Sequence, residues 1–100
     1  MIKAVNVVAR RTLEAFWSVH PTAKAPLISW YRVTGAADWK SFADVRGTFN
    51  SADQVAGKVV FNIGGNNYRL VALVAYRTQR VFVLWIGTHR DYDRLDVAGL

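Results

Sequence analysis

Residues 58–86 read KVVFNIGGNNYRLVALVAYRTQRVFVLWI, and this stretch decides the fold. It holds three runs rich in β-branched and aromatic residues, at 58–63, 67–76 and 81–86. Such residues favour strands, and the glycines and asparagines between the first two runs favour a tight turn. Residues 77–80 are few enough to reverse the chain again. The stretch therefore predicts a three-stranded antiparallel meander.

A first amphipathic helix is predicted upstream of the meander. From about Ala9 the apolar residues follow the i, i+3, i+4, i+7 spacing of one helix face, and Pro21 ends the helix. The residues on this inward face are Leu13, Phe16, Trp17 and His20. We interpret His20 as a packed or capping residue rather than a catalytic one.

A second helix is predicted over 22–33, with Thr22 as its N-cap and Gly35 as its terminator. Pro26 is compatible with it, because the N–H groups of the first turn have no partner inside a helix. The residues expected to face inward are Leu27, Ile28 and Tyr31.

The remaining N-terminal half is less regular. Residues 2–8 predict a short strand, and 36–57 predict a crossing loop with one turn of helix, where Ser41 and Asp44 have capping-box spacing. Three apolar residues should attach that loop to the core: Phe42, Val45 and Phe49. We therefore expect one α+β domain over 1–100, with a meander and an N-terminal strand packed against two N-terminal helices.

Composition indicates a globular domain that attracts polyanions. The 100 residues are 52% hydrophobic, and 13 Lys and Arg against 7 Asp and Glu give a net charge of +6. This charge favours association with nucleic acid or with an acidic protein. With no apolar run long enough for export or for a membrane span, and no cysteine, we expect a cytoplasmic protein.

Arg69 is the first candidate site residue. It lies in the predicted central strand among apolar neighbours, where a guanidinium needs an anionic partner or a route to solvent. One interpretation pairs it with a structural carboxylate. The other makes it a clamp for a phosphate group.

The segment 88–93, THRDYD, is the second candidate. His89 is the best general acid or base, because imidazole titrates near neutral pH. RNA cleavage needs a base near the 2′-OH, cations on the phosphate and an acid for the leaving oxygen. Arg69, His89, Arg90 and Tyr92 could together meet these needs, and Tyr92 could also stack a base.

A metal reading of the same segment is the weaker alternative. His89, Asp91 and Asp93 would lie on one side of an extended tail. The two aspartates are more simply partners for Arg90 and Arg94, or caps for a short helix starting near Asp91. We therefore expect no metal and no other cofactor.

Two motifs resemble those of the HigB-type toxins of bacterial toxin–antitoxin systems. They are VFNIGGNNYRL at residues 60–70 and THRDYD at 88–93, and the likeness extends over nearly the whole chain. Asp91 stands where the family more often has glutamate, which keeps the carboxylate.

The resemblance implies a RelE-like fold, ribosome-dependent cleavage of mRNA, and neutralisation by a HigA-like helix-turn-helix antitoxin that gives only an indirect link to DNA. It implies that Arg69 binds phosphate and that His89 and Tyr92 carry the chemistry. Lys58, Arg90 and Arg77 are expected to be weaker RNA contacts. Two alternatives remain open: a non-catalytic RNA or ribosome binder that blocks translation, and an interaction subunit for an acidic partner.

Overall fold

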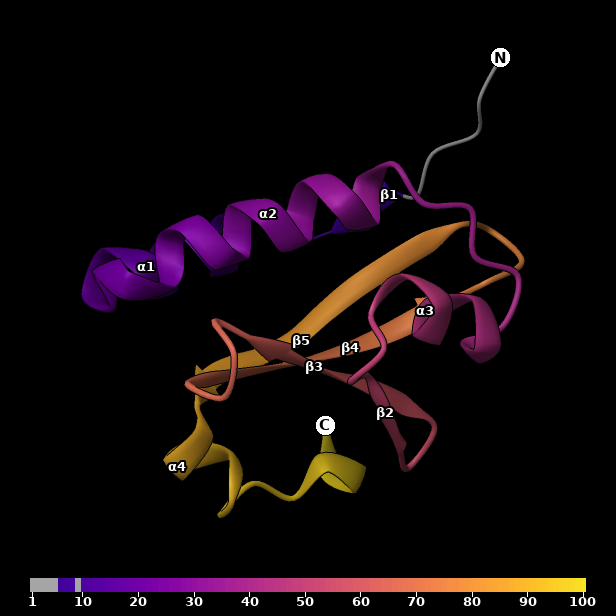
Figure 1. The fold of residues 1–100 in the computed structure, drawn as a ribbon. Helices are drawn as coiled ribbons and strands as arrows, with labels where there is room; N and C mark the ends of the chain where they lie inside the picture. Colours follow the sequence, from indigo (N-terminus) through magenta and orange to yellow (C-terminus); the bar gives the residue numbers. More distant parts are fainter. Residues whose placement is uncertain (1–5, 9) are drawn as a thin grey trace.

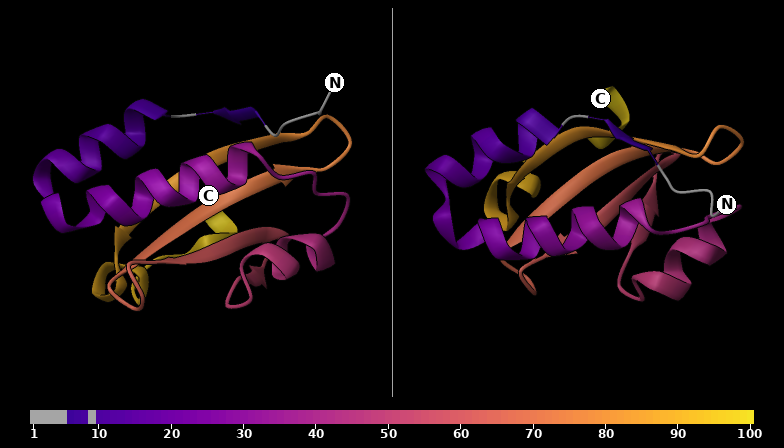
Figure 2. Two further views of the ribbon diagram at one scale, coloured as in Figure 1. Left: turned by 45° about the horizontal axis from the view of Figure 1, so that its top comes forward. Right: turned by 90° about the horizontal axis from the view of Figure 1, so that it is seen from above.

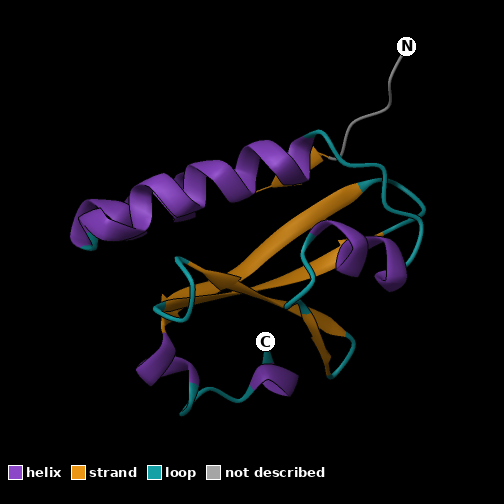
Figure 3. Ribbon diagram, viewed as in Figure 1, coloured by secondary structure: helices purple, strands orange, loops and turns teal. Residues whose placement is uncertain are grey.

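The computed structural model describes residues 6–8 and 10–100, and it has the α+β organisation expected from the sequence (Figures 1 and 3). Its strands form one five-stranded sheet in the order β1-β5-β4-β3-β2. The strands are β1 (Asn6–Val8), β2 (Asp53–Val55), β3 (Lys58–Ile63), β4 (Tyr68–Ala75) and β5 (Arg80–Thr88). The helices are α1 (Arg10–Val19), η1 (Pro21–Ala23), α2 (Lys24–Gly35), α3 (Phe42–Thr48), α4 (His89–Tyr92) and η2 (Val97–Gly99).

The predicted meander is confirmed. β3 pairs with β4 and β4 with β5, both antiparallel. β1 adds a parallel edge strand on β5, which confirms the end of the predicted N-terminal strand, whereas residues 2–5 lie outside the described residues. β2, within the predicted loop 36–57, was not expected; it pairs antiparallel with β3 through a tight turn at Ala56 and Gly57.

The helices cover one face of the sheet. α1 and α2 lie side by side above it (Figure 2). Their buried side chains join those of β3, β4 and β5 in one core cluster, which includes Leu13, Leu27, Trp30, Phe61 and Leu70. Ile28 and Tyr31, which were expected inside, are only half-buried. His20 is packed as predicted, stacked on Phe16 with 4.4 Å between ring centroids.

Two predicted caps are wrong. Pro21–Ala23 form the 3-10 turn η1, so α2 starts at Lys24 rather than after Thr22. The Thr22 hydroxyl is hydrogen-bonded to the Tyr68 hydroxyl instead of capping the helix. The capping box at Ser41 also does not form among the described residues, because the Asp44 carboxylate accepts from the backbone N–H of Lys40 (2.8 Å).

The C-terminal tail covers the opposite face of the sheet (Figure 1). There Val60 of β3 and Val71 of β4 form a second, smaller cluster with Val97 of the tail. Tyr92 and Leu95 pack against it. The sequence predicted cover for one face only, so this second layer is a finding of the structure. Within the described part of the chain, none of the helices has the length and apolarity needed to cross a bilayer.

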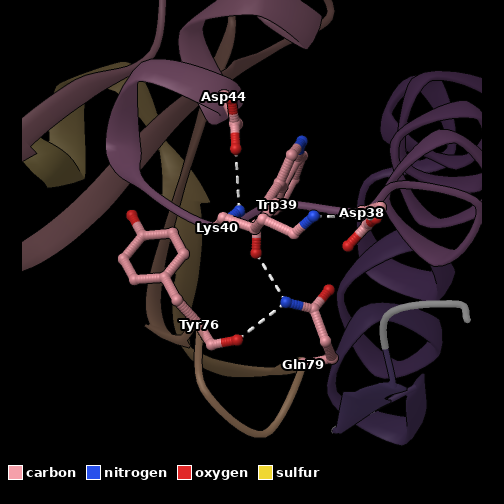
Figure 4. A network of polar contacts seen from close by, with 6 residues as sticks. All are labelled: Asp38, Trp39, Lys40, Asp44, Tyr76 and Gln79. Carbon is pink, nitrogen blue, oxygen red and sulfur yellow. Dashed lines mark hydrogen bonds and ion pairs between the residues drawn. The ribbon is translucent and has the colours of Figure 1, made fainter.

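The buried side chain of Gln79 stabilises the end of the sheet that is remote from the tail (Figure 4). The Gln79 side-chain amide donates to the carbonyl oxygen of Trp39 (2.6 Å) and to that of Tyr76 (2.7 Å). Gln79 has a φ of 55°, in the left-handed region, so the turn between β4 and β5 accepts strain that these bonds offset. One side chain thus joins this turn to the loop before α3.

We expect Gln79→Ala to destabilise the fold by about 2 kcal/mol, because two carbonyl oxygens lose their donor inside the protein. Urea unfolding followed by circular dichroism measures the change. Thr78→Ala, at the exposed neighbouring position, is the matched control. Equal stability of the two variants would contradict a locking role for Gln79.

Candidate active site

The loop between β3 and β4 organises the candidate site. Gly64 and Gly65 have φ values of 62° and 68°, which residues other than glycine rarely adopt. They turn the chain so that Ile63 pairs with Tyr68. The loop then presents Asn66 and the carbonyl group of Asn67 toward the candidate residues. Strand β4 follows the loop directly, which agrees with the predicted tight turn.

Arg69 is held by neutral acceptors. Its guanidinium donates to the Asn66 side-chain oxygen (2.6 Å) and to the Tyr68 carbonyl oxygen (3.2 Å). Within residues 6–8 and 10–100, no carboxylate forms an ion pair with Arg69. The interpretation of Arg69 as the partner of a structural carboxylate is therefore wrong. Its positive charge is oriented but not neutralised, as binding of a phosphate requires.

His89 is anchored to the same loop. Its backbone N–H donates to the Asn67 carbonyl oxygen (2.9 Å), at the point where β5 ends and α4 begins. The Thr88 hydroxyl accepts from the Asp91 N–H (3.1 Å) and caps this short helix. In consequence, residues 66 and 67 hold Arg69 and His89 at one end of the sheet, where α4 lies beside the loop (Figure 1).

The imidazole of His89 has two different sides. Its Nδ1 is buried without a hydrogen-bond partner among the described residues, and the nearest carboxylate oxygen, Asp93 Oδ1, is 3.8 Å away. The side chain as a whole is nevertheless 42% exposed. The exposed area of this side chain therefore does not lie at Nδ1.

Tyr92 lies on the sheet face that also carries Arg69. Its ring packs against the cluster of Val60 and Val71, and its centroid is 6.2 Å from that of Trp85 at an interplanar angle of 51°. Arg69 is two residues before Val71 in β4, so the alternation of the strand puts both on this face. Arg69 and Tyr92, which are distant in the sequence, thus lie on one face of the sheet, and His89 starts α4 at the end of β5 beside the loop that holds Arg69.

The weaker RNA-contact candidates are spread more widely. Arg90 is exposed on α4, beside His89. Lys58 starts β3 on the same face as Val60, about 13 Å along the strand from Asn62, the cross-strand partner of Arg69. Arg77 lies beyond Ala75, which is itself about 20 Å from Arg69 along β4. The structure therefore does not bring Arg77 to the candidate site.

The tail is not arranged as a metal site. Residues 89–92 are helical rather than extended, so the geometry assumed for ligation by His89, Asp91 and Asp93 does not occur. In the described part of the chain, no three potential ligands gather around a common point. The pairing of these aspartates with Arg90 and Arg94 is also absent from the described ion pairs, where Asp93 instead faces His89.

The sequence pointed to Arg69, His89 and Tyr92 as candidates but did not predict the contacts that hold them. Asn66 and Asn67 were read as turn residues, and nothing in their identity shows that one binds Arg69 through its side chain and the other His89 through its backbone. Trp85 was not among the candidate site residues. Its contact with Tyr92 depends on the tail folding back over the sheet.

One sheet with this strand order, covered by helices on one face and by the tail on the other, fits a RelE-like fold. Residues 23–95 match the family model described as the HigB toxin, the RelE-like toxic component of a toxin-antitoxin system. The chain therefore belongs to the HigB toxin family. Membership in a toxin–antitoxin system implies that the protein has an antitoxin partner.

Individual relatives are similar over nearly their whole length. The mRNA interferase HigB of Escherichia coli O6:H1 is 28% identical over 94 residues, which cover 91% of each chain. The mRNA interferase toxin HigB of Escherichia coli K12 is 25% identical over 92 residues, covering 89% of this chain and 88% of the relative. The mRNA interferase HigB of Shigella flexneri shows the same values.

We expect Thr88→Ala to loosen α4, because the cap that satisfies the Asp91 N–H is lost at a cost of about 1 kcal/mol. Hydrogen exchange at the Asp91 amide should become about fivefold faster, since that free energy separates the closed from the open form. Thr88→Ser keeps the hydroxyl and should exchange like the wild type. Unchanged protection in Thr88→Ala would show that the cap does not hold the helix.

Proposed function

We propose that this protein is an mRNA interferase, an endoribonuclease that cleaves mRNA on the ribosome and so inhibits translation. The observation that carries the proposal is the un-neutralised guanidinium of Arg69 at the same end of the sheet as His89 and Tyr92. The names of the relatives, mRNA interferases, support the same activity.

In the proposed reaction, the ribose 2′-oxygen attacks the adjacent phosphorus atom and the bond to the 5′-oxygen breaks. A base takes the proton of the 2′-OH, and an acid donates a proton to the leaving 5′-oxygen. Arg69 stabilises the charge that develops on the non-bridging phosphate oxygens. Phosphoryl transfer depends mainly on positioning and charge stabilisation, so few groups suffice.

His89 and Tyr92 share the proton transfers in this proposal. The imidazole takes or gives a proton, and Asp93 Oδ1 lies 3.8 Å from its Nδ1. Tyr92 orients the nucleophile or donates a proton from its hydroxyl group. Arg90 and Lys58 add longer-range electrostatic attraction for the RNA backbone. Arg77 contributes only to the overall positive electrostatic potential of the protein.

The partners follow from the family and the charge. We propose that a HigA-like antitoxin with a helix-turn-helix domain neutralises the toxin and provides its only link to DNA. The net charge of +6 favours approach to ribosomal and messenger RNA. We therefore propose a cytoplasmic location, where translating ribosomes are found.

Loss of any central residue should abolish toxicity. We expect Arg69→Ala, His89→Ala and Tyr92→Ala each to lower the cleavage rate on translating ribosomes at least about a hundredfold, the usual effect of losing one group that stabilises developing charge or transfers a proton. Induction in bacteria with mapping of mRNA 5′ ends measures this.

Arg46→Ala is the matched control, because Arg46 is an exposed arginine on α3, which lies with the helix-side core. Full toxicity of His89→Ala and Tyr92→Ala would reject the assignment. Inhibition of translation by the wild type without new mRNA ends would instead favour the non-catalytic binder, for which the positive charge alone is the argument.

Cleavage should not require a metal ion bound to the toxin. Ribosomes need magnesium to stay assembled, so they are chemically fixed in their assembled form before the assay. The rate of mRNA cleavage is then measured with and without EDTA. We expect equal cleavage rates in both, because the proposed chemistry uses only protein groups. Loss of activity in EDTA that returns with one divalent metal would overturn the metal-free mechanism.

A further inference from the structure

Gly87 of β5 has no room for a side chain. A Cβ atom built on it would lie 2.4 Å from both Cζ2 and Cη2 of Trp85. Real contacts of this kind do not occur, so the indole ring of Trp85 occupies the space above Gly87. The glycine is therefore needed for the position of the tryptophan, and not for a turn or a positive φ.

The indole ring of Trp85 is directed along the strand toward the candidate site. Trp85 is paired with Val71 across the sheet, whereas Gly87 is paired with Arg69. By lying over Gly87, the indole extends from its own position in the strand to the level of the guanidinium-bearing residue. Its other neighbour is Tyr92, with 6.2 Å between ring centroids.

An irregularity in β5 gives Trp85 this direction. Strict alternation would put Val81, Val83, Trp85 and Gly87 on one face. Val81 and Val83 belong to the helix-side core, however, while Trp85 packs with Val71 on the face of the tail. The register shifts between Val71 and Ala72, which pair with Trp85 and Val83 and leave Leu84 as the extra residue. This bulge redirects Trp85, a use of bulges that is common beside active sites.

We propose that Trp85 is the stacking platform for one unpaired base of the RNA, the base next to the phosphate held by Arg69. This inference rests on the proposed function and adds a substrate subsite to it. Indole rings stack on bases of single-stranded RNA, and the contact tolerates any base because each has a π face. Trp85 is only partly buried, as a residue that contacts substrate must be.

The geometry excludes a base sandwiched between Trp85 and Tyr92. Sandwiching a base between two rings requires about 7 Å between them, twice the contact distance of carbon atoms. The 6.2 Å between Trp85 and Tyr92, with their planes inclined by 51°, is too short for this. A base therefore cannot insert between these two rings, and it stacks on a part of the indole that Tyr92 does not cover.

The test uses RNA that cannot be cleaved. Ribosomes programmed with a labelled mRNA carrying 2′-O-methyl ribose bind the toxin without reaction, and the affinity is measured for variants whose fold is checked by urea unfolding. Trp85→Ala should weaken binding about tenfold, the usual effect of losing one stacked base. Trp85→Phe should recover most of it. Leu73→Ala, an exposed apolar residue of the same face, is the control and should bind as the wild type does.

A second test compares the effect of Gly87→Ala in the wild type and in the Trp85→Ala variant. Gly87→Ala should weaken binding as much as Trp85→Ala does, because the added methyl group displaces the indole. In a Trp85→Ala background the same Gly87→Ala change should have no further effect, since the clash is gone. The proposal that Trp85 stacks a base would be contradicted by additive effects of Gly87→Ala and Trp85→Ala on affinity. Equal affinities of wild type and Trp85→Ala would also contradict it. A wild type that binds with this pattern but cleaves no normal mRNA would reject the nuclease and leave the platform standing.

Discussion

The fold depends on burying the central strand β4 on both of its faces. Leu70, Val71 and Ala72 are consecutive, so they point alternately to opposite faces, and all three are fully buried. Helices α1 and α2 can cover only one of these faces. The other must be covered by the remaining chain, which is the tail that carries Tyr92 and Val97. Burial of Val71 thereby brings the tail onto the face of Arg69 and assembles the candidate site.

Much of this architecture could be predicted because local pattern and final structure agree. The boundaries of β3 were predicted as observed, and the amphipathic spacing around Leu13 located α1. An apolar run such as residues 70–75 is typical of a strand buried on both faces, but it does not say what covers the second one. The tail has only a few apolar residues, so its return over the sheet gave no periodic signal. β2 and the Thr22 hydrogen bond to Tyr68 likewise depend on contacts between distant segments.

The candidate site residues could be singled out for a different reason, because their side chains are unusual for their surroundings in the sequence. A guanidinium within an apolar strand and a histidine among charged residues stand out in any sequence. What the sequence could not give is their relation in space, which depends on the loop 64–67 holding both. The same limit explains Arg77. Its charge suits RNA as well as that of Lys58, but a strand of eight residues separates it from the site.

The site keeps polar groups in a state that costs stability. Arg69 has only neutral acceptors, and His89 Nδ1 is buried without a partner in the described chain, although a carboxylate in place of Asn66 could neutralise the first. Each such group is less favourable than a fully paired one. A paired arginine, however, would have to give up its partner before binding a phosphate. A neutral acceptor orients the guanidinium equally well and leaves its charge for the substrate, so the incomplete pairing is what the proposed chemistry needs.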